Sequence, residues 1–216
     1  ALLVRRYEPA ISLDTAIVLN LDSDDYALRY RTLATELGIV VAASVATHLA
    51  GKRQSVGLFT NGHDPLRAAG QDRGTWDFEP ALPPREGRGH LMQLLDILAR
   101  IEPAPGSETS RGARARAARE GPPSGRSQGI GQGERFLSLL TRRTMSLTWG
   151  STIIVITPSE VEGLIPTLLG LRRRGLAVVL LLTCPDRGLA QTVQRAAQIG
   201  VQTVRVWSEK DMDVWR

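Results

Sequence analysis

The chain has 216 residues, of which 42% are hydrophobic, and a formal net charge of +5 at pH 7. This length and apolar content suit one α/β domain with an inserted segment. A single cysteine, Cys184, excludes an internal disulfide and a cysteine-rich metal site, and no uninterrupted apolar run reaches the roughly 20 residues that span a bilayer.

The first part of the chain predicts strands at 2–7 (weak) and 14–21, a long helix at 26–50 and a strand at 54–60. The helix is indicated by apolar residues at spacings of three and four. Asp24 or Asp25 is placed to cap its first turn. The face that it should bury comprises Leu33, Leu37, Val40, Val41, Ser44, Val45, His48 and Leu49.

The middle of the chain is less regular. Residues 61–87 are rich in proline, glycine and charge, with Trp76 and Phe78 as possible anchors, and 89–101 have a helical pattern that ends before Pro103. Residues 103–133 contain almost nothing apolar and are built from Gly, Pro, Ser, Ala and Arg. Such a composition buries too little surface to offset the entropy of ordering, so we expect a disordered insert within one domain spanning 1–216.

The last part of the chain alternates regularly between helices and strands. We predict helices at 134–144, 161–174 and 187–199, and apolar strands at 152–157, 176–183 and 201–207. Strands that are apolar throughout and alternate with helices indicate a doubly wound, mostly parallel sheet with helices on both faces.

Polar side chains follow several of the predicted strands. The carboxyl ends of the strands are where open α/β sheets bind ligands. We therefore predict a binding rim there, formed after the first strand, the next strand and a later strand by Asn20, Asp22, Asp24, Asp25, Asn61, His63 and Ser159.

The order of several short motifs resembles a von Willebrand factor A-type domain, and more narrowly the bacterial domain-of-unknown-function 58 family. The motifs are Leu2-Leu3-Val4-Arg5-Arg6-Tyr7-Glu8-Pro9, the strand at 16–21, Val56-Gly57-Leu58-Phe59, Leu82-Pro83-Pro84, Gly87-Arg88-Gly89-His90-Leu91 and Val204-Arg205-Val206. The resemblance implies Rossmann-type layering and a membrane-associated bacterial protein, in the cytoplasm or on the cytoplasmic side of the membrane. It also implies a MoxR-type AAA+ ATPase as partner.

Members of the A-domain group often bind Mg²⁺ at a metal-ion-dependent adhesion site, and here the motif is altered. Asn20 stands where the motif has aspartate, Asp22 and Asp24 replace its two serines, and Pro158 replaces a later acidic residue. Either Asn20, Asp22 and Asp24 form an altered cation site, or the site is lost and the acidic residues cap a helix and solvate a loop. We favour the second interpretation and expect no cofactor, with Mg²⁺ as the alternative.

These observations favour a non-enzymatic protein-interaction module with a degenerate adhesion site, acting with the ATPase in assembly or maturation. One alternative is a metal-dependent hydrolase that uses Asp22 and Asp24. Another is a polyanion-binding tether formed by the arginines of the insert, although no aromatic residue lies among them to stack on bases. We therefore expect no nucleic-acid partner, and membrane contact only through segments outside this chain.

Overall fold

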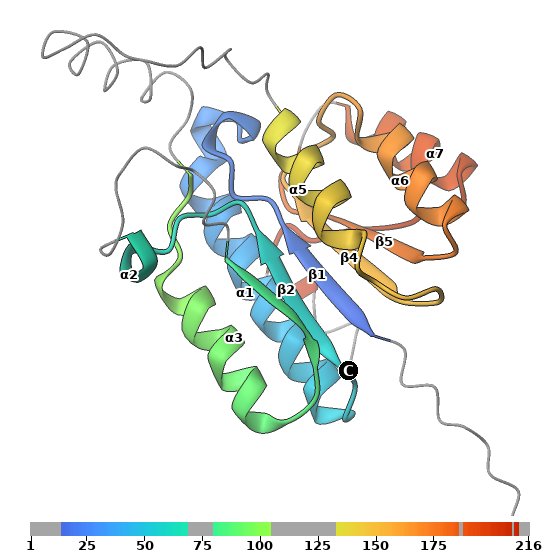
Figure 1. The fold of residues 1–216 in the computed structure, drawn as a ribbon. Helices are drawn as coiled ribbons and strands as arrows, with labels where there is room; N and C mark the ends of the chain where they lie inside the picture. The colour runs from blue at the N-terminus through green and yellow to red at the C-terminus, as the bar shows by residue number, and fades with distance from the viewer. Residues whose placement is uncertain (1–13, 69–79, 105–132, 186–187, 209, 212–216) are drawn as a thin grey trace, which may run out of the picture.

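The computed structural model describes residues 14–68, 80–104, 133–185, 188–208 and 210–211. Six strands form one sheet in the order β3-β2-β1-β4-β5-β6, with helices on both of its faces (Figure 1). Five strands are parallel, and only β3 runs antiparallel, paired with β2. The predicted α/β fold class is therefore confirmed. The strands are β1 (Thr15–Leu19), β2 (Val56–Thr60), β3 (Ala81–Arg85), β4 (Thr152–Thr157), β5 (Ala177–Leu182) and β6 (Gln202–Arg205).

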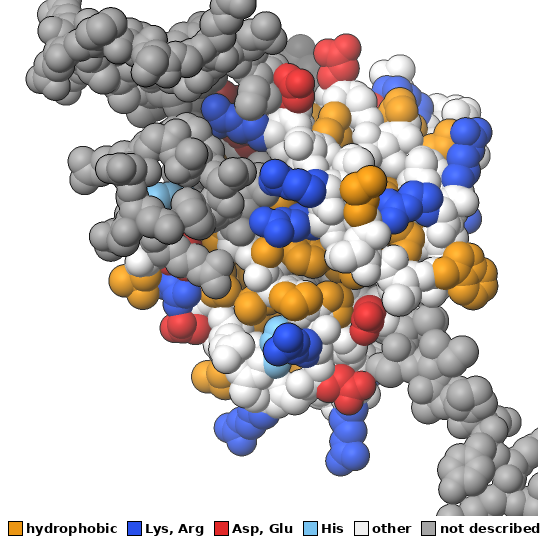
Figure 2. Space-filling model, viewed as in Figure 1, with side chains coloured by type: hydrophobic (Ala, Val, Ile, Leu, Met, Phe, Trp, Pro, Cys, Tyr) orange, Lys and Arg blue, Asp and Glu red, His pale blue; other side chains and the backbone are white. Residues whose placement is uncertain are grey.

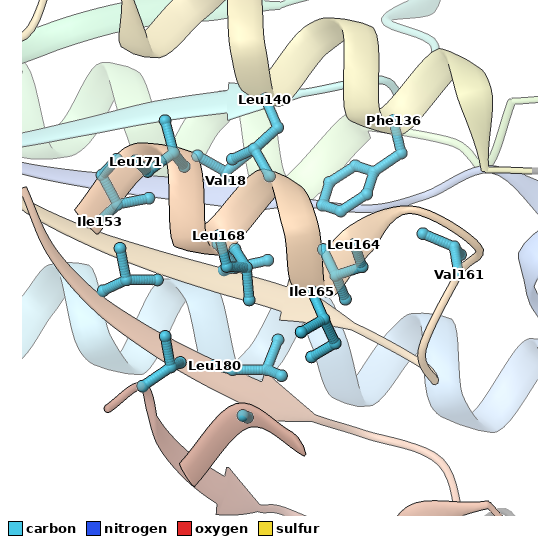
Figure 3. Packing of buried hydrophobic residues seen from close by; sticks show 14 of the residues in the cluster. Val18, Phe136, Leu140, Ile153, Val161, Leu164, Ile165, Leu168, Leu171 and Leu180 are labelled. Atoms are coloured by element: carbon cyan, nitrogen blue, oxygen red, sulfur yellow. The ribbon is translucent and has the colours of Figure 1, made fainter. Parts of the chain in front are cut away.

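The central strand β1 is buried on both faces, which is why its sequence is apolar throughout. Ala16 and Val18 face the layer formed by α5, α6 and α7, while Ile17 and Leu19 face α1 and α3. Figure 3 shows Phe136 of α5 beside Val18 and the leucines of α6. The helices are α1 (Arg31–Gly51), α2 (Pro65–Ala68), α3 (Arg88–Arg100), α5 (Glu134–Thr144), α6 (Leu164–Arg173) and α7 (Leu189–Gln198).

Helix α1 differs from the sequence prediction in its start and in its buried face. Two 3-10 turns, Ser23–Asp25 and Leu28–Tyr30, precede it, so neither Asp24 nor Asp25 caps α1. Of the predicted apolar face, Leu33 is 68% exposed, and Ser44 and His48 are also exposed. The buried face of α1 instead contains several small residues, which let the helix approach the sheet closely. Its members are Ala34, Thr35, Leu37, Gly38, Val41, Ala42, Val45 and Ala46.

The segment Leu28–Gly51 is long and apolar enough to meet a membrane-span criterion of length and composition. In this structure it packs against β1, β2 and α3, as the core helix of a domain does. The sequence pattern of α1 is therefore explained by burial inside the domain.

Strand β3 and the short helix α2 were not predicted from the sequence. Pro83 and Pro84 argue against a strand, but β3 lies at an edge of the sheet, where proline is tolerated. A Cβ atom added at Gly57 of β2 would lie 2.6 Å from the Pro84 nitrogen, so the glycine permits the close approach of β3. The predicted strand at 2–7, Trp76, Phe78 and residues 105–132 of the insert lie outside the described residues.

Candidate functional site

Asn20 forms the centre of a buried hydrogen-bond network at the carboxyl end of β1. It is fully buried, and its backbone N–H donates to the Ile156 carbonyl (2.8 Å). Its Nδ2 donates to Asp25 Oδ2 (2.8 Å) and to Thr157 Oγ1 (3.2 Å). Its Oδ1 accepts from the Asp22 backbone N–H (3.1 Å) and from Asn61 Nδ2 (3.0 Å). The fixed Asp22 donor and the Asp25 acceptor define which way the amide points.

The network joins three neighbouring strands, because Asn61, Asn20 and Thr157 lie at the carboxyl ends of β2, β1 and β4. Asn61 Oδ1 also accepts from the Leu21 N–H (2.6 Å), which fixes the loop that follows β1. The Thr157 hydroxyl donates to the Ser159 carbonyl (3.1 Å) and so fixes the loop that follows β4. We call Asn20, Asp25, Asn61 and Thr157 the Asn20 network. Buried hydrogen bonds that join three strand ends in this way hold the loops between them in place.

Two carboxylates are buried here, Asp25 within the network and Asp22 next to it. Asp25 is 5% exposed, and burial raises its pKa to about 6, while its hydrogen bond from Asn20 acts in the opposite direction. The same value includes the charges of Asp22 and Asp24, which raise the Asp25 pKa, and the backbone amide of Gly133, which lowers it. Burial also raises the pKa of Asp22, whose Oδ1 accepts from the Asp24 N–H (3.1 Å) and caps the first 3-10 turn.

The structure separates the predicted rim into a buried floor and an outer part. Four of its residues are buried and support the surface from below: Asn20, Asp22, Asp25 and Asn61. The residues of the predicted rim that are only half-buried are Asp24, His63 and Ser159.

Sequence reasoning missed an ion pair on the far side of the His63 loop. Asp64 Oδ1 accepts from Arg100 Nε (2.9 Å), and Asp64 Oδ2 accepts from Arg100 Nη2 (3.0 Å). This bidentate ion pair joins the loop after β2 to the end of α3. The Asp64 side chain is fully buried, and the contact raises the pKa of Arg100. The chain reinforces it by pairing His63 with Glu102 through two backbone hydrogen bonds of 2.7 and 2.8 Å. No sequence signal links Asp64 to an arginine 36 positions away.

Comparison with known structures fits this arrangement of a mostly parallel sheet with one antiparallel edge. An aerotolerance-related membrane protein from Bacteroides fragilis NCTC 9343, with multiple mutations to serines, superposes with a TM-score of 0.51 at 14% identity, over 93% of this chain and 94% of that chain. The chain has a von Willebrand factor A-like fold.

Two further structures resemble the von Willebrand factor A-like chain. The conserved hypothetical protein BatB from Bacteroides thetaiotaomicron has a TM-score of 0.49 at 17% identity, over 94% of this chain and 95% of that chain. The VWA domain of SpRpn10 has a TM-score of 0.45 at 13% identity, over 90% and 88%. No protein-family model and no curated protein sequence matches the chain, so membership of the domain-of-unknown-function 58 family stays a prediction.

The adhesion-site metal implied for a von Willebrand factor A-like fold can be tested against the residues present. Magnesium binds oxygen ligands, yet the Asn20 N–H₂ group lies between the oxygens of Asp25 and Thr157 and donates to both. The Asn20 oxygen already accepts two hydrogen bonds. In the part of the chain that the structure describes, no group of three or more His, Cys, Asp or Glu side chains is placed to hold a metal ion. The Asn20 network in this arrangement therefore does not fit Mg²⁺.

Proposed function

We propose that this chain is a non-enzymatic protein-interaction module that binds its partner at the carboxyl edge of the sheet without a divalent cation. The Asn20 network is the observation that carries the proposal. A metal ion in an adhesion site ties its loops together and leaves a coordination position for an acidic group of the partner. Here amide and carboxylate hydrogen bonds tie the corresponding loops, and Nδ2 of Asn20 takes the central position.

The surface above the network carries the Asp24 carboxylate and two exposed apolar side chains. Asp24 lies in the first 3-10 turn after β1. Leu28, in the second 3-10 turn, is 81% exposed, and Leu66, in α2, is 71% exposed. We call Asp24, His63, Ser159, Leu28 and Leu66 the exposed rim. Without a bound cation, the rim has no metal to coordinate an acidic group of a partner. A partner that complements the Asp24 carboxylate and the exposed leucines therefore presents basic and apolar side chains.

For the partner we propose a MoxR-type AAA+ ATPase, acting with this chain in the assembly or maturation of other complexes. The support is the sequence resemblance to a family whose members commonly accompany such ATPases. A location in the bacterial cytoplasm, or on the cytoplasmic side of the membrane, belongs to the same proposal. It is compatible with the membrane protein from B. fragilis among the structural neighbours.

A binding measurement with matched variants tests the proposal. The exposed-rim variant combines Asp24→Ala, Leu28→Ala and Leu66→Ala, and the control combines Asp96→Ala, Met92→Ala and Met145→Ala, which removes one carboxylate and two apolar side chains elsewhere. Affinity for the purified ATPase, measured by biolayer interferometry, should fall roughly tenfold or more only in the exposed-rim variant. Equal affinity of the two variants would refute the proposed surface.

Calorimetric titration with Mg²⁺ tests the cation-independent part of the proposal. We expect no saturable heat of binding in the wild type, because the Asn20 amide already uses its donors and acceptors within the protein. Saturable binding that disappears in a folded Asp22→Ala variant would show that the altered cation site exists, and would overturn the metal-free mechanism.

A further inference from the structure

The edge of the sheet opposite the exposed rim is strongly basic. The parallel strands begin there, α1, α5 and α6 end there, and α3 begins there next to the end of β3 (Figure 1). Among the described residues this edge carries only two carboxylates, Asp14 and Glu86. Against them stand Lys52, Arg53, Arg85, Arg88, Arg142, Arg143, Arg172, Arg173 and Arg174. We call these nine basic residues, together with Met145 and Trp149, the amino edge.

The basic residues of the amino edge come from elements that are held together by specific contacts. Arg174 Nη2 donates to the Thr144 carbonyl (3.3 Å), which joins the ends of α6 and α5. His90 Nε2 lies 2.9 Å from the Val56 carbonyl, which joins the start of α3 to the start of β2. These contacts join neighbouring elements of the edge, and Figure 2 shows Lys and Arg side chains projecting from the bottom of the domain in that view.

Two large apolar side chains project from the same edge. Trp149 is 82% exposed and Met145 is 68% exposed, both in the connection between α5 and β4. The indole ring of Trp149 lies directly against Gly175, where any side chain would collide with it. The Gly150 N–H donates to the Gly175 carbonyl (3.0 Å) and fixes the same turn. Trp149 is thus an aromatic side chain that lies beside a fixed turn and faces solvent.

Cations at the ends of α5 and α6 complement the helix dipoles, but that does not account for an exposed tryptophan and methionine beside them. Exposed tryptophan among arginine and lysine side chains is the composition that binds membrane interfaces, where the indole lies at the headgroup level and the cations meet anionic lipid. Binding to single-stranded nucleic acid uses several aromatic side chains as stacking platforms, and among the described residues of the amino edge Trp149 is the only exposed aromatic side chain.

We propose that the amino edge docks on an anionic bilayer surface, with Trp149 and Met145 at the level of the headgroups. This departs from the sequence-based expectation that membrane contact requires segments outside the chain. Because the exposed rim lies at the other end of the strands, docking by the amino edge turns the rim away from the bilayer.

Vesicle sedimentation with the 216-residue chain tests the proposal. The vesicles contain phosphatidylcholine alone or an equal mixture of phosphatidylcholine and phosphatidylglycerol. We expect binding to the anionic vesicles only, weakened by added salt. Lys52→Gln, Arg88→Gln and Arg173→Gln together should lower the partition coefficient roughly a hundredfold, since each basic side chain near the surface contributes about fivefold.

A control of equal charge separates position from net charge. Arg29→Gln, Arg205→Gln and Lys210→Gln remove three exposed basic side chains outside the amino edge and should retain most of the binding. Trp149→Ala should weaken binding, whereas Trp207→Ala, at a 50% exposed tryptophan after β6, should not. Thermal unfolding checks that every variant is folded.

Three outcomes would overturn the proposal. The first is equal loss of binding in the two triple variants, which would indicate adsorption by net charge. The second is equal retention of binding in both, which would assign the contact to other arginines of the chain. The third is failure to bind anionic vesicles together with binding to a DNA duplex, which would make the amino edge a nucleic-acid surface.

Discussion

Replacing Asp25 with asparagine measures how much the buried, charged carboxylate lowers the free energy of unfolding. Burial raises the Asp25 pKa from 3.8 to about 6, so between about pH 4 and pH 6 the native state binds more protons than the unfolded state. Stability associated with this proton is present at low pH and is lost as the pH rises through the folded-state pKa. A difference of about two pKa units corresponds to about 3 kcal/mol lost above pH 6.

Asparagine removes the charge and keeps an acceptor for Asn20 Nδ2, although that hydrogen bond is then weaker by about 1 kcal/mol. We therefore expect Asp25→Asn to raise the free energy of unfolding at pH 8 by about 1–2 kcal/mol, and to have almost no effect at pH 4. Urea unfolding followed by circular dichroism across this pH range measures both values. Glu162→Gln, which neutralises an exposed carboxylate after β4, is the control for removing one negative charge.

The reasoning fails if Asp25→Asn is less stable than the wild type at pH 8. It also fails if the difference between the two proteins is the same at pH 4 and pH 8. Either result would mean that the Asp25 carboxylate is not held in an environment that disfavours its charge.

Two other substitutions test the packing around the sheet. Phe136→Ala should lower the free energy of unfolding by about 3–5 kcal/mol in urea denaturation, because this fully buried ring joins α5 to β1 and α6, and a loss below 1 kcal/mol would contradict that packing. Gly57→Ala should cost about 1–3 kcal/mol and speed amide exchange at Thr60, whose N–H donates to Pro80, because the new methyl group collides with β3. Gly51→Ala, where the added Cβ meets nothing within 4 Å, should be neutral or slightly stabilising, and equal stability of the two glycine variants would refute the close approach of β3.

The parts of the fold that could be predicted are those in which burial dictates composition. Thr152–Thr157 and Glu134–Thr144 have the predicted bounds, since the strand is apolar throughout and the helix has a clear apolar stripe. The buried face of helix α1 was harder to predict, because alanine and glycine form much of it while Leu33 faces solvent. Strand β3 contains two prolines, which have a low propensity for strands. Gly57 in the neighbouring strand is the sequence feature that is consistent with a second backbone close by.

The position of the candidate site was predictable, but its chemistry was not. The predicted strand ends placed Asn20, Asp22 and Asn61 on one edge of the sheet, where the structure has them. Which of these side chains are buried depends on how the loops fold back, and the contact between Asn20 and Thr157 spans 137 positions. The role of Asn20 as a donor to Asp25 likewise follows from the tight 3-10 turn after β1, which has no strong sequence signature.

The prolines of β3 also affect how the domain behaves among copies of itself. An exposed sheet edge is a template for pairing with another chain, and self-association through such edges leads to aggregation. In the described part of the chain β3 and β6 are the two outer strands. Pro83 and Pro84 have no N–H to donate, and β6 is only four residues long. In the described part of the chain neither border therefore offers a long run of backbone donors, which disfavours the addition of a strand from another molecule.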